Sequence, residues 1–208
     1  MVNNKKQEKL IRVVTCLGFA DAHEDDPLFK EAFEVGKALA TAGYTVANGG
    51  GPGVMRASTL GAKSVGGHVI GVTFYPKDVS IFEGRDINNP IDEEIKGANY
   101  LERTLKLLEV GQAYVFFRGG TGTISEFGMA WGLARLYFGH HKPLILYGKF
   151  WENIMAAYLA NMLMRPEEFQ VYRVVTSPDE VIKSLELFEL MLQHKHQAFN
   201  PAEKPFEL

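Results

Sequence analysis

Short apolar runs alternate with amphipathic segments along most of the chain. Six runs rich in β-branched and aromatic residues have the length of buried strands, and they cover residues 11–17, 44–47, 68–74, 113–117, 144–147 and 172–175. Between and after them, apolar residues recur near helical spacing over residues 27–42, 54–64, 97–110, 123–137, 150–164 and 178–192. Strands that alternate with helices predict an α/β fold, a Rossmann-like doubly wound parallel sheet with helices on both faces.

Two segments lack this pattern. Residues 75–97 carry Pro76, Gly84 and Asn88-Asn89-Pro90 among mixed charges, so we expect a long irregular loop there, of the kind that is usually functional or mobile. Residues 193–208 include two prolines and predict a weakly ordered tail. No repeat or break in composition divides the remainder, so residues 1–208 are predicted to form one domain with its core over 10–192.

Composition narrows the function classes. The chain has 208 residues, of which 46% are hydrophobic, and a formal net charge of −3 without a basic patch, which disfavours a nucleic-acid partner. No apolar run approaches the roughly 18 residues of a membrane span. The polar N-terminal segment shows no signal peptide, and the one cysteine, Cys16, permits no internal disulfide. We therefore expect a cytoplasmic protein whose partner is a small molecule.

The most informative segment follows the strand at 113–117. Arg118 leads into the run Gly119-Gly120-Thr121-Gly122-Thr123, which opens the next helix. Free N–H groups and the dipole at a helix start bind anions, and glycine lets a phosphate approach the backbone closely. No Gly-Lys-Ser/Thr follows and the spacing is not G-x-G-x-x-G, so this loop predicts phosphate binding of neither the Walker nor the dinucleotide type.

A second glycine loop, Asn48-Gly49-Gly50-Gly51-Pro52-Gly53, follows the strand at 44–47. Both loops stand at the carboxyl ends of strands, where doubly wound sheets bind ligands. Two such loops in one small domain predict a nucleotide-binding domain, although the earlier loop is also compatible with a tight strand-to-helix crossing alone. Glu126 places a carboxylate one turn into the helix after the later loop.

The two loops together resemble the Lonely Guy (LOG) family. The resemblance covers about residues 11–175 and rests on Gly49-Gly50-Gly51-x-Gly53-x-Met55 and on Gly119-Gly120-x-Gly122-Thr123-x-x-Glu126. It implies hydrolysis of the N-glycosidic bond of a nucleoside 5′-monophosphate, of the AMP or cytokinin riboside monophosphate type, to free base and ribose 5-phosphate. The family's catalytic glutamate falls on Glu126, and its catalytic arginine, fifteen positions before the motif's proline, falls on Arg103.

The resemblance assigns further residues and shows departures. It implies phosphate binding by Gly119, Gly120, Thr121, Gly122 and Thr123, and nucleotide binding by Gly18, Gly49, Gly50, Gly51, Gly53 and Met55. Arg118 replaces the motif's proline and adds a cation beside the phosphate site, while Thr104 and Ser125 stand where many members carry lysine and an acidic residue. After the first strand, Cys16-Leu17-Gly18-Phe19 matches the family's Cys-Gly-Ser only in part.

These residues lead to one hypothesis and its alternatives. Arg103 is expected to hold Glu126 ionised, and neither a metal nor another cofactor is needed; His140-His141 lacks ligands at metal spacing. The helix over 123–137 is apolar on most sides, which predicts a homodimer or higher homo-oligomer. The alternatives are a non-catalytic nucleotide or molybdenum-cofactor binding or carrier protein, and a sensor of a ligand such as ADP-ribose.

Overall fold

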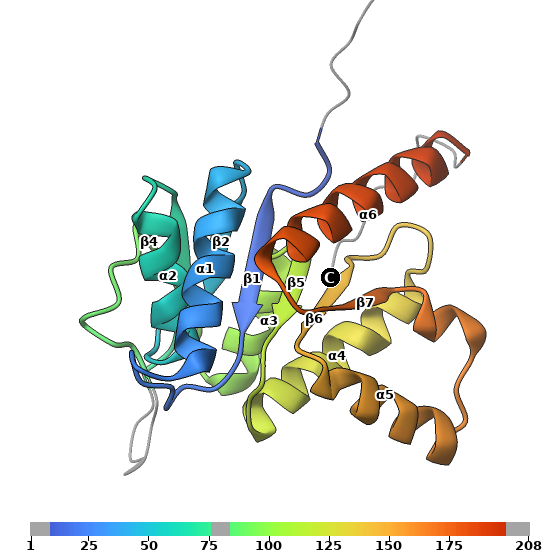
Figure 1. Ribbon diagram of the computed structural model, residues 1–208, viewed down its shortest axis with the longest axis horizontal. Coiled ribbons are helices and arrows are strands. Elements are labelled where there is room, and N and C mark those ends of the chain that lie inside the picture. The colour runs from blue at the N-terminus through green and yellow to red at the C-terminus, as the bar shows by residue number, and fades with distance from the viewer. Residues whose placement is uncertain (1–8, 76–83, 199–208) are drawn as a thin grey trace, which may run out of the picture.

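The computed structural model describes residues 9–75 and 84–198, and within them lies a sheet of seven strands in the order β4-β3-β2-β1-β5-β6-β7 (Figure 1). All six neighbouring pairs are parallel. The strands are β1 Val13–Leu17, β2 Thr45–Asn48, β3 Val69–Thr73, β4 Glu93–Lys96, β5 Ala113–Phe116, β6 Leu144–Tyr147 and β7 Tyr172–Val175. The predicted α/β fold, a doubly wound parallel sheet, is confirmed.

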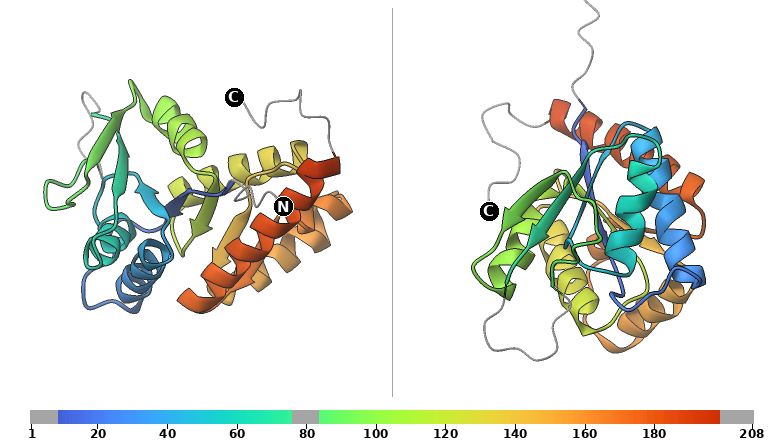
Figure 2. Two further views of the ribbon diagram at one scale, coloured as in Figure 1. Left: turned by 90° about the horizontal axis from the view of Figure 1, so that it is seen from above. Right: turned by 90° about the vertical axis from the view of Figure 1, so that its left-hand side faces the viewer.

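In the described part of the chain, six α-helices cover the two faces of the sheet. They are α1 Pro27–Thr41, α2 Val54–Lys63, α3 Tyr100–Val110, α4 Thr121–Leu136, α5 Phe150–Asn161 and α6 Pro178–Ala198, with a 3-10 turn, η1, at Pro166–Phe169. One apolar core lies under α1, α2 and α6, and the other lies under α3, α4 and α5. Figure 2 shows α1 and α2 on the opposite side of the strands from α3. Each helix thus buries one apolar stripe against the sheet.

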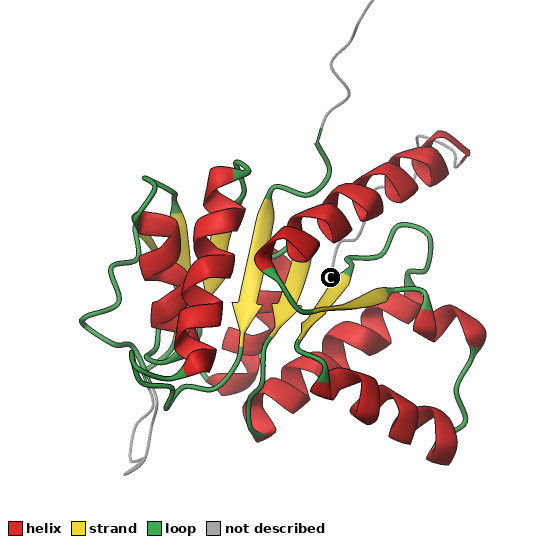
Figure 3. Cartoon of the chain, viewed as in Figure 1, coloured by secondary structure: helices red, strands yellow, loops and turns green. Residues whose placement is uncertain are grey.

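Successive strands are added first on one side of β1 and then on the other side. From β1 the sheet grows outward through β2 and β3 to β4, and the chain then returns to β5 on the other side of β1. Ligands of doubly wound sheets bind at such a switch point, outside the carboxyl ends of the strands. The arrows of β1 and β5 point to that edge in Figure 3. The two glycine loops, which follow β2 and β5, therefore flank the end of β1.

The structure corrects two predictions of irregular or weakly ordered segments. The segment predicted as an irregular loop contains β4, which pairs from Ile70↔Glu93 to Thr73↔Lys96. Its sequence, Glu-Glu-Ile-Lys, hides the strand because three of four residues are charged, as is common at a sheet edge. Helix α6 runs to Ala198 rather than ending at 192, so the first residues of the predicted weakly ordered tail are helical. Residues 76–83 and 199–208 lie outside the described residues.

No helix in the described part of the chain is both long enough and apolar enough to cross a membrane.

Candidate active site

Helix α3 begins in a way that turns Arg103 toward the sheet. The Asn99 side chain caps the helix by accepting a hydrogen bond from the Glu102 N–H at 2.9 Å. The Glu102 carboxylate reaches back and accepts from the Ala98 N–H at 2.8 Å. Together these bonds fix the first turn, and Arg103 lies in it with only 9% of its surface exposed.

The Arg103 guanidinium lies between β3 and the loop after β2. Its Nε donates to the Val72 carbonyl at 3.1 Å, and its Nη2 lies 3.4 Å from the Gly49 carbonyl oxygen and 3.7 Å from the Met55 sulfur. A buried cation is costly unless its N–H groups find acceptors. Backbone oxygens at the carboxyl edge of the sheet therefore hold this charge in place.

Glu126 faces Arg103 from the neighbouring helix α4. Arg103 Nη1 and Glu126 Oε1 are 3.6 Å apart, and the two side chains are 10% and 8% exposed. Burial raises the pKa of Glu126 to about 7, and the opposing attraction of Arg103 offsets only part of that rise. Arg103 acts in the predicted direction, since its charge favours the ionised carboxylate, but desolvation by burial is the larger cause and leaves the pKa near neutrality.

The glycines of the loop after β2 fit tightly around their neighbours. A Cβ on Gly49 would overlap the guanidinium of Arg103. Gly53 has φ +61, a left-handed conformation, and a Cβ there would meet the carbonyl oxygens of Phe19 and Ala20. This loop therefore positions Arg103 and the end of β1, and the prediction that its glycines also touch a nucleotide stays a prediction.

The loop after β5 is more open. Gly120 has no atom within 4 Å of where its Cβ would lie, whereas a Cβ on Gly119 would overlap the side chain of Thr123. Thr123 is 5% exposed, and no hydrogen bond within the described ranges uses its hydroxyl group. Helix α4 begins at Thr121, so its first N–H groups have no helical partners. Free amides and an unpartnered hydroxyl thus meet at one helix start.

Two asparagines that the sequence reasoning left without a role fasten the loop after β2. Asn48 accepts from the Gly50 N–H at 2.9 Å and donates to Thr59 Oγ1 at 2.8 Å. Asn89 donates to the Gly51 carbonyl at 2.8 Å. The position of Asn48 at a strand end before glycine is typical of an Asx turn and was a usable signal. Asn89 lies in the irregular segment, where no periodicity pointed to it.

Two residues that the sequence analysis considered, Gly18 and His141, make no contact with the Arg103–Glu126 pair among the interactions described above. A Cβ on Gly18 would lie 2.8 Å from Val54 and 2.9 Å from Phe117, so this glycine permits close packing of β1 against the start of α2. His141 follows the end of α4, is 4% exposed and stacks on Phe138. Within residues 9–75 and 84–198 no group of three His, Cys, Asp or Glu residues is arranged to hold a metal ion.

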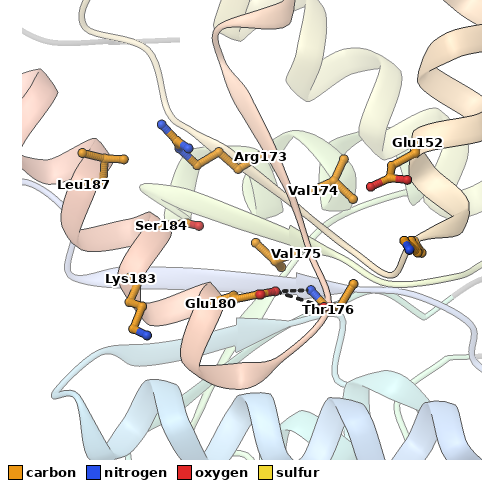
Figure 4. Close-up of a pocket in the computed structure, with 10 residues that line it drawn as sticks. Glu152, Arg173, Val174, Val175, Thr176, Glu180, Lys183, Ser184 and Leu187 are labelled. Carbon is orange, nitrogen blue, oxygen red and sulfur yellow. Dashed lines mark hydrogen bonds between the residues drawn. The ribbon is translucent and has the colours of Figure 1, made fainter.

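A separate open cavity of about 420 Å³ lies beside the edge strand β7, between the starts of α5 and α6 (Figure 4). It is lined by cationic, acidic and hydroxyl side chains, among them Lys149, Arg173, Glu180, Lys183 and Ser184. Arg103, Glu126 and both glycine loops are absent from its lining, so this cavity is distinct from the candidate active site.

Sequence comparison finds distant relatives. The chain is 31% identical over 124 residues to an uncharacterized protein of Archaeoglobus fulgidus, a match that covers 60% of this chain and 78% of that protein. It is 34% identical over 121 residues to the cytokinin riboside 5′-monophosphate phosphoribohydrolase of Mycobacterium tuberculosis. This second match covers 57% of the chain and 62% of that enzyme, so it spans less than two thirds of the enzyme's length.

Solved structures share the fold. The molybdenum cofactor binding protein of Rippkaea orientalis superposes with a TM-score of 0.64 at 21% identity, over 86% of this chain and 97% of that one. The molybdenum cofactor carrier protein of Chlamydomonas reinhardtii gives a TM-score of 0.59 at 24% identity, over 85% and 97%. The sequence model of one family, the SLOG cluster4 family, matches residues 11–172.

Proposed function

Because the chain belongs to the SLOG cluster4 family, we propose that it hydrolyses the N-glycosidic bond of a nucleoside 5′-monophosphate. The observation that carries the proposal is the buried pair of Arg103 and Glu126, 3.6 Å apart beside both glycine loops. A buried ionisable pair at the ligand-binding edge of a doubly wound sheet is typical of a catalytic centre. The substrate is of the AMP or cytokinin riboside monophosphate type, and the products are free base and ribose 5-phosphate.

The 5′-phosphate binds at the start of α4. The backbone N–H groups of Gly120, Thr121 and Gly122 and the hydroxyl of Thr123 supply the donors, and the helix dipole adds a favourable field. The hydroxyl of Thr123 supports this assignment because it belongs to a residue only 5% exposed and has no partner among the described residues. Anchoring the phosphate places the ribose over Glu126, one turn further along the same helix.

The reaction breaks the C1′–N bond and adds water across it. The bond to the base cleaves through an oxocarbenium-like state, water adds its hydroxyl group to C1′, and the remaining proton of that water passes through Glu126 to the departing base. Ionised Glu126 stabilises the positive charge and accepts a proton from the attacking water. Arg103 orients the Glu126 carboxylate and the substrate. Because the pKa of Glu126 is about 7, its ionised fraction rises with pH through neutrality, and the rate follows it.

The alternative is a binding protein without hydrolysis. The structural likeness to molybdenum-cofactor binding and carrier proteins favours it, because those proteins hold that cofactor on the same fold. The same glycine loops would hold the phosphate of such a ligand. The buried Arg103–Glu126 pair favours the enzyme, since a carrier has no need of a carboxyl group with a pKa near neutrality.

One incubation separates these classes. Purified protein is mixed with AMP or with adenosine, and free adenine is measured by chromatography. The enzyme releases adenine from AMP much faster than from adenosine, and ribose 5-phosphate competes. A carrier or sensor binds AMP and releases no adenine. Faster cleavage of adenosine would show that the loop at Gly119 to Thr123 has no phosphate role.

The surface of α4 supports a homodimer or larger oligomer. Part of the apolar surface of this helix is covered within its own subunit, since Phe127 and Trp131 are buried there. The exposed face is instead a stripe at intervals of four residues, Ile124, Gly128, Gly132 and Leu136, of which Ile124 is 54% and Leu136 is 63% exposed. Residues at this spacing share one helix face. The two glycines offer no side chain there, so a second copy can approach this helix closely.

A further inference from the structure

Arg118 stands at the junction of β5 and the glycine loop that begins α4. Its carbonyl oxygen accepts a hydrogen bond from the Phe19 N–H at 3.0 Å, which ties this junction to the end of β1. Its side chain is exposed at the carboxyl edge of the sheet. The backbone of Arg118 is thus fixed at the candidate phosphate site, and its side chain is accessible to a ligand there.

An aromatic ring holds the guanidinium beside the loop. The central carbon of the Arg118 guanidinium lies 4.6 Å from the centre of the Phe150 ring, at the start of α5. The ring fits there because Gly148 has φ +113 and no Cβ, and a Cβ would lie 2.6 Å from a ring carbon of Phe150. Arg118, three residues before α4 begins, therefore packs its guanidinium on the first residue of α5.

No ion pair within the described residues neutralises the charge of Arg118. None of the aspartates and glutamates in the described ranges forms an ion pair with it, whereas Arg103 faces Glu126 at 3.6 Å. The amides at the start of α4 and the hydroxyl of Thr123 already suffice for one phosphate group. Arg118 adds a planar group of N–H donors, which suits the oxygens of a further phosphate.

We infer that Arg118 binds a second phosphate of the ligand, so that the site prefers a nucleoside 5′-diphosphate to the corresponding monophosphate. The inference rests on the proposed function, since it assumes that the first phosphate sits on the loop from Gly119 to Thr123. The ribose and base keep their places beside Arg103 and Glu126, and the same C1′–N bond is cleaved. A proline at this position, as in the motif that the loop resembles, would offer no such contact.

The test compares the affinities of ADP and AMP by calorimetry, without divalent cations that would mask the diphosphate. Both are measured in the full chain carrying Glu126→Gln, so that neither nucleotide is consumed. We expect ADP to bind at least about tenfold more tightly than AMP, the scale of one charge-assisted contact. Adding Arg118→Gln weakens ADP binding about tenfold and changes AMP binding less than about twofold. Added salt narrows the difference between the two ligands.

Two controls separate this role from a structural one. Arg165→Gln removes an equal charge from another exposed arginine and leaves both affinities unchanged. Arg118→Lys keeps the charge and retains part of the preference for ADP. The inference is overturned if Arg118→Gln weakens the binding of AMP and ADP equally. It is also overturned if the protein carrying Glu126→Gln alone shows no preference for ADP. If AMP is hydrolysed but ADP is not preferred, only this inference fails; if neither nucleotide binds and no adenine is released, the proposed function fails with it.

Discussion

Replacing Glu126 by glutamine makes the protein more stable at alkaline pH while it abolishes turnover. Glu126 is 6% exposed, and burial raises its pKa from the ordinary 4.5 to about 7. In the unfolded chain the carboxyl ionises near 4.5, so between pH 4.5 and 7 the folded state holds a proton that the unfolded state has lost. Stability therefore falls as pH rises through this window and levels off above it.

The size of the effect follows from the same shift. One pKa unit corresponds to about 1.4 kcal/mol, so a rise of this size costs the folded state on the order of 3 kcal/mol once pH exceeds 7. Glutamine keeps the shape of the side chain and carries no charge. The free energy of unfolding of Glu126→Gln, relative to the wild type, is therefore expected to increase by about 3 kcal/mol between pH 4 and pH 8.

Urea unfolding at a series of pH values measures this difference, with the midpoint and slope fitted at each pH. Glu152→Gln, which removes an exposed carboxylate, serves as the control and shows no comparable trend. A difference between Glu126→Gln and the wild type that stays flat with pH would refute the reasoning. A difference of the opposite sign would show that Arg103 dominates and that the carboxylate is stabilised as an ion.

Three further predictions test the parts of the site and its surroundings. Gly49→Ala places a methyl group where the Arg103 guanidinium lies, so kcat for AMP cleavage should fall about 100-fold in steady-state assays, and an unchanged kcat would remove the positioning role of this glycine. Thr123→Val removes a hydroxyl that has no partner among the described residues, at nearly constant volume, and should weaken binding of inorganic phosphate several-fold by equilibrium dialysis; equal affinity would place the phosphate elsewhere. Light scattering at low micromolar concentration should report at least twice the chain mass of 23.2 kDa. Gly132→Glu should reduce the measured mass to that of one chain. A wild-type protein that is monomeric and fully active would contradict the proposed interface.

The fold was predictable from the sequence where the hydrophobic pattern was strong. The strands at Leu144–Tyr147 and Tyr172–Val175 were predicted at their observed bounds, because short apolar runs between helices have few other interpretations. The edge strand at Glu93–Lys96 was missed, because three of its four residues are charged and exposed, so it carries no apolar signal. The end of the helix that begins at Pro178 was also missed, because the periodic apolar pattern stops before the helix does.

The site was predictable in its parts but not in its electrostatics. The family-like spacing selected Arg103 and Glu126, and the structure brings them together across α3 and α4. Spacing alone could not show that burial would outweigh the charge of Arg103 at Glu126, since that balance depends on the helices and loops packed around both residues. Nor could it show that Gly49 and Met55 lie against the guanidinium of Arg103.

The most direct test of the central claim is the rate of adenine release from AMP by the wild type, Arg103→Ala, Glu126→Ala and the double variant. If the two residues act as one unit, each single replacement lowers kcat at least about 100-fold. The double variant is then little slower than the slower single variant, because residues that share one function are not additive. Adenine release by Glu126→Ala at nearly the wild-type rate would contradict the account.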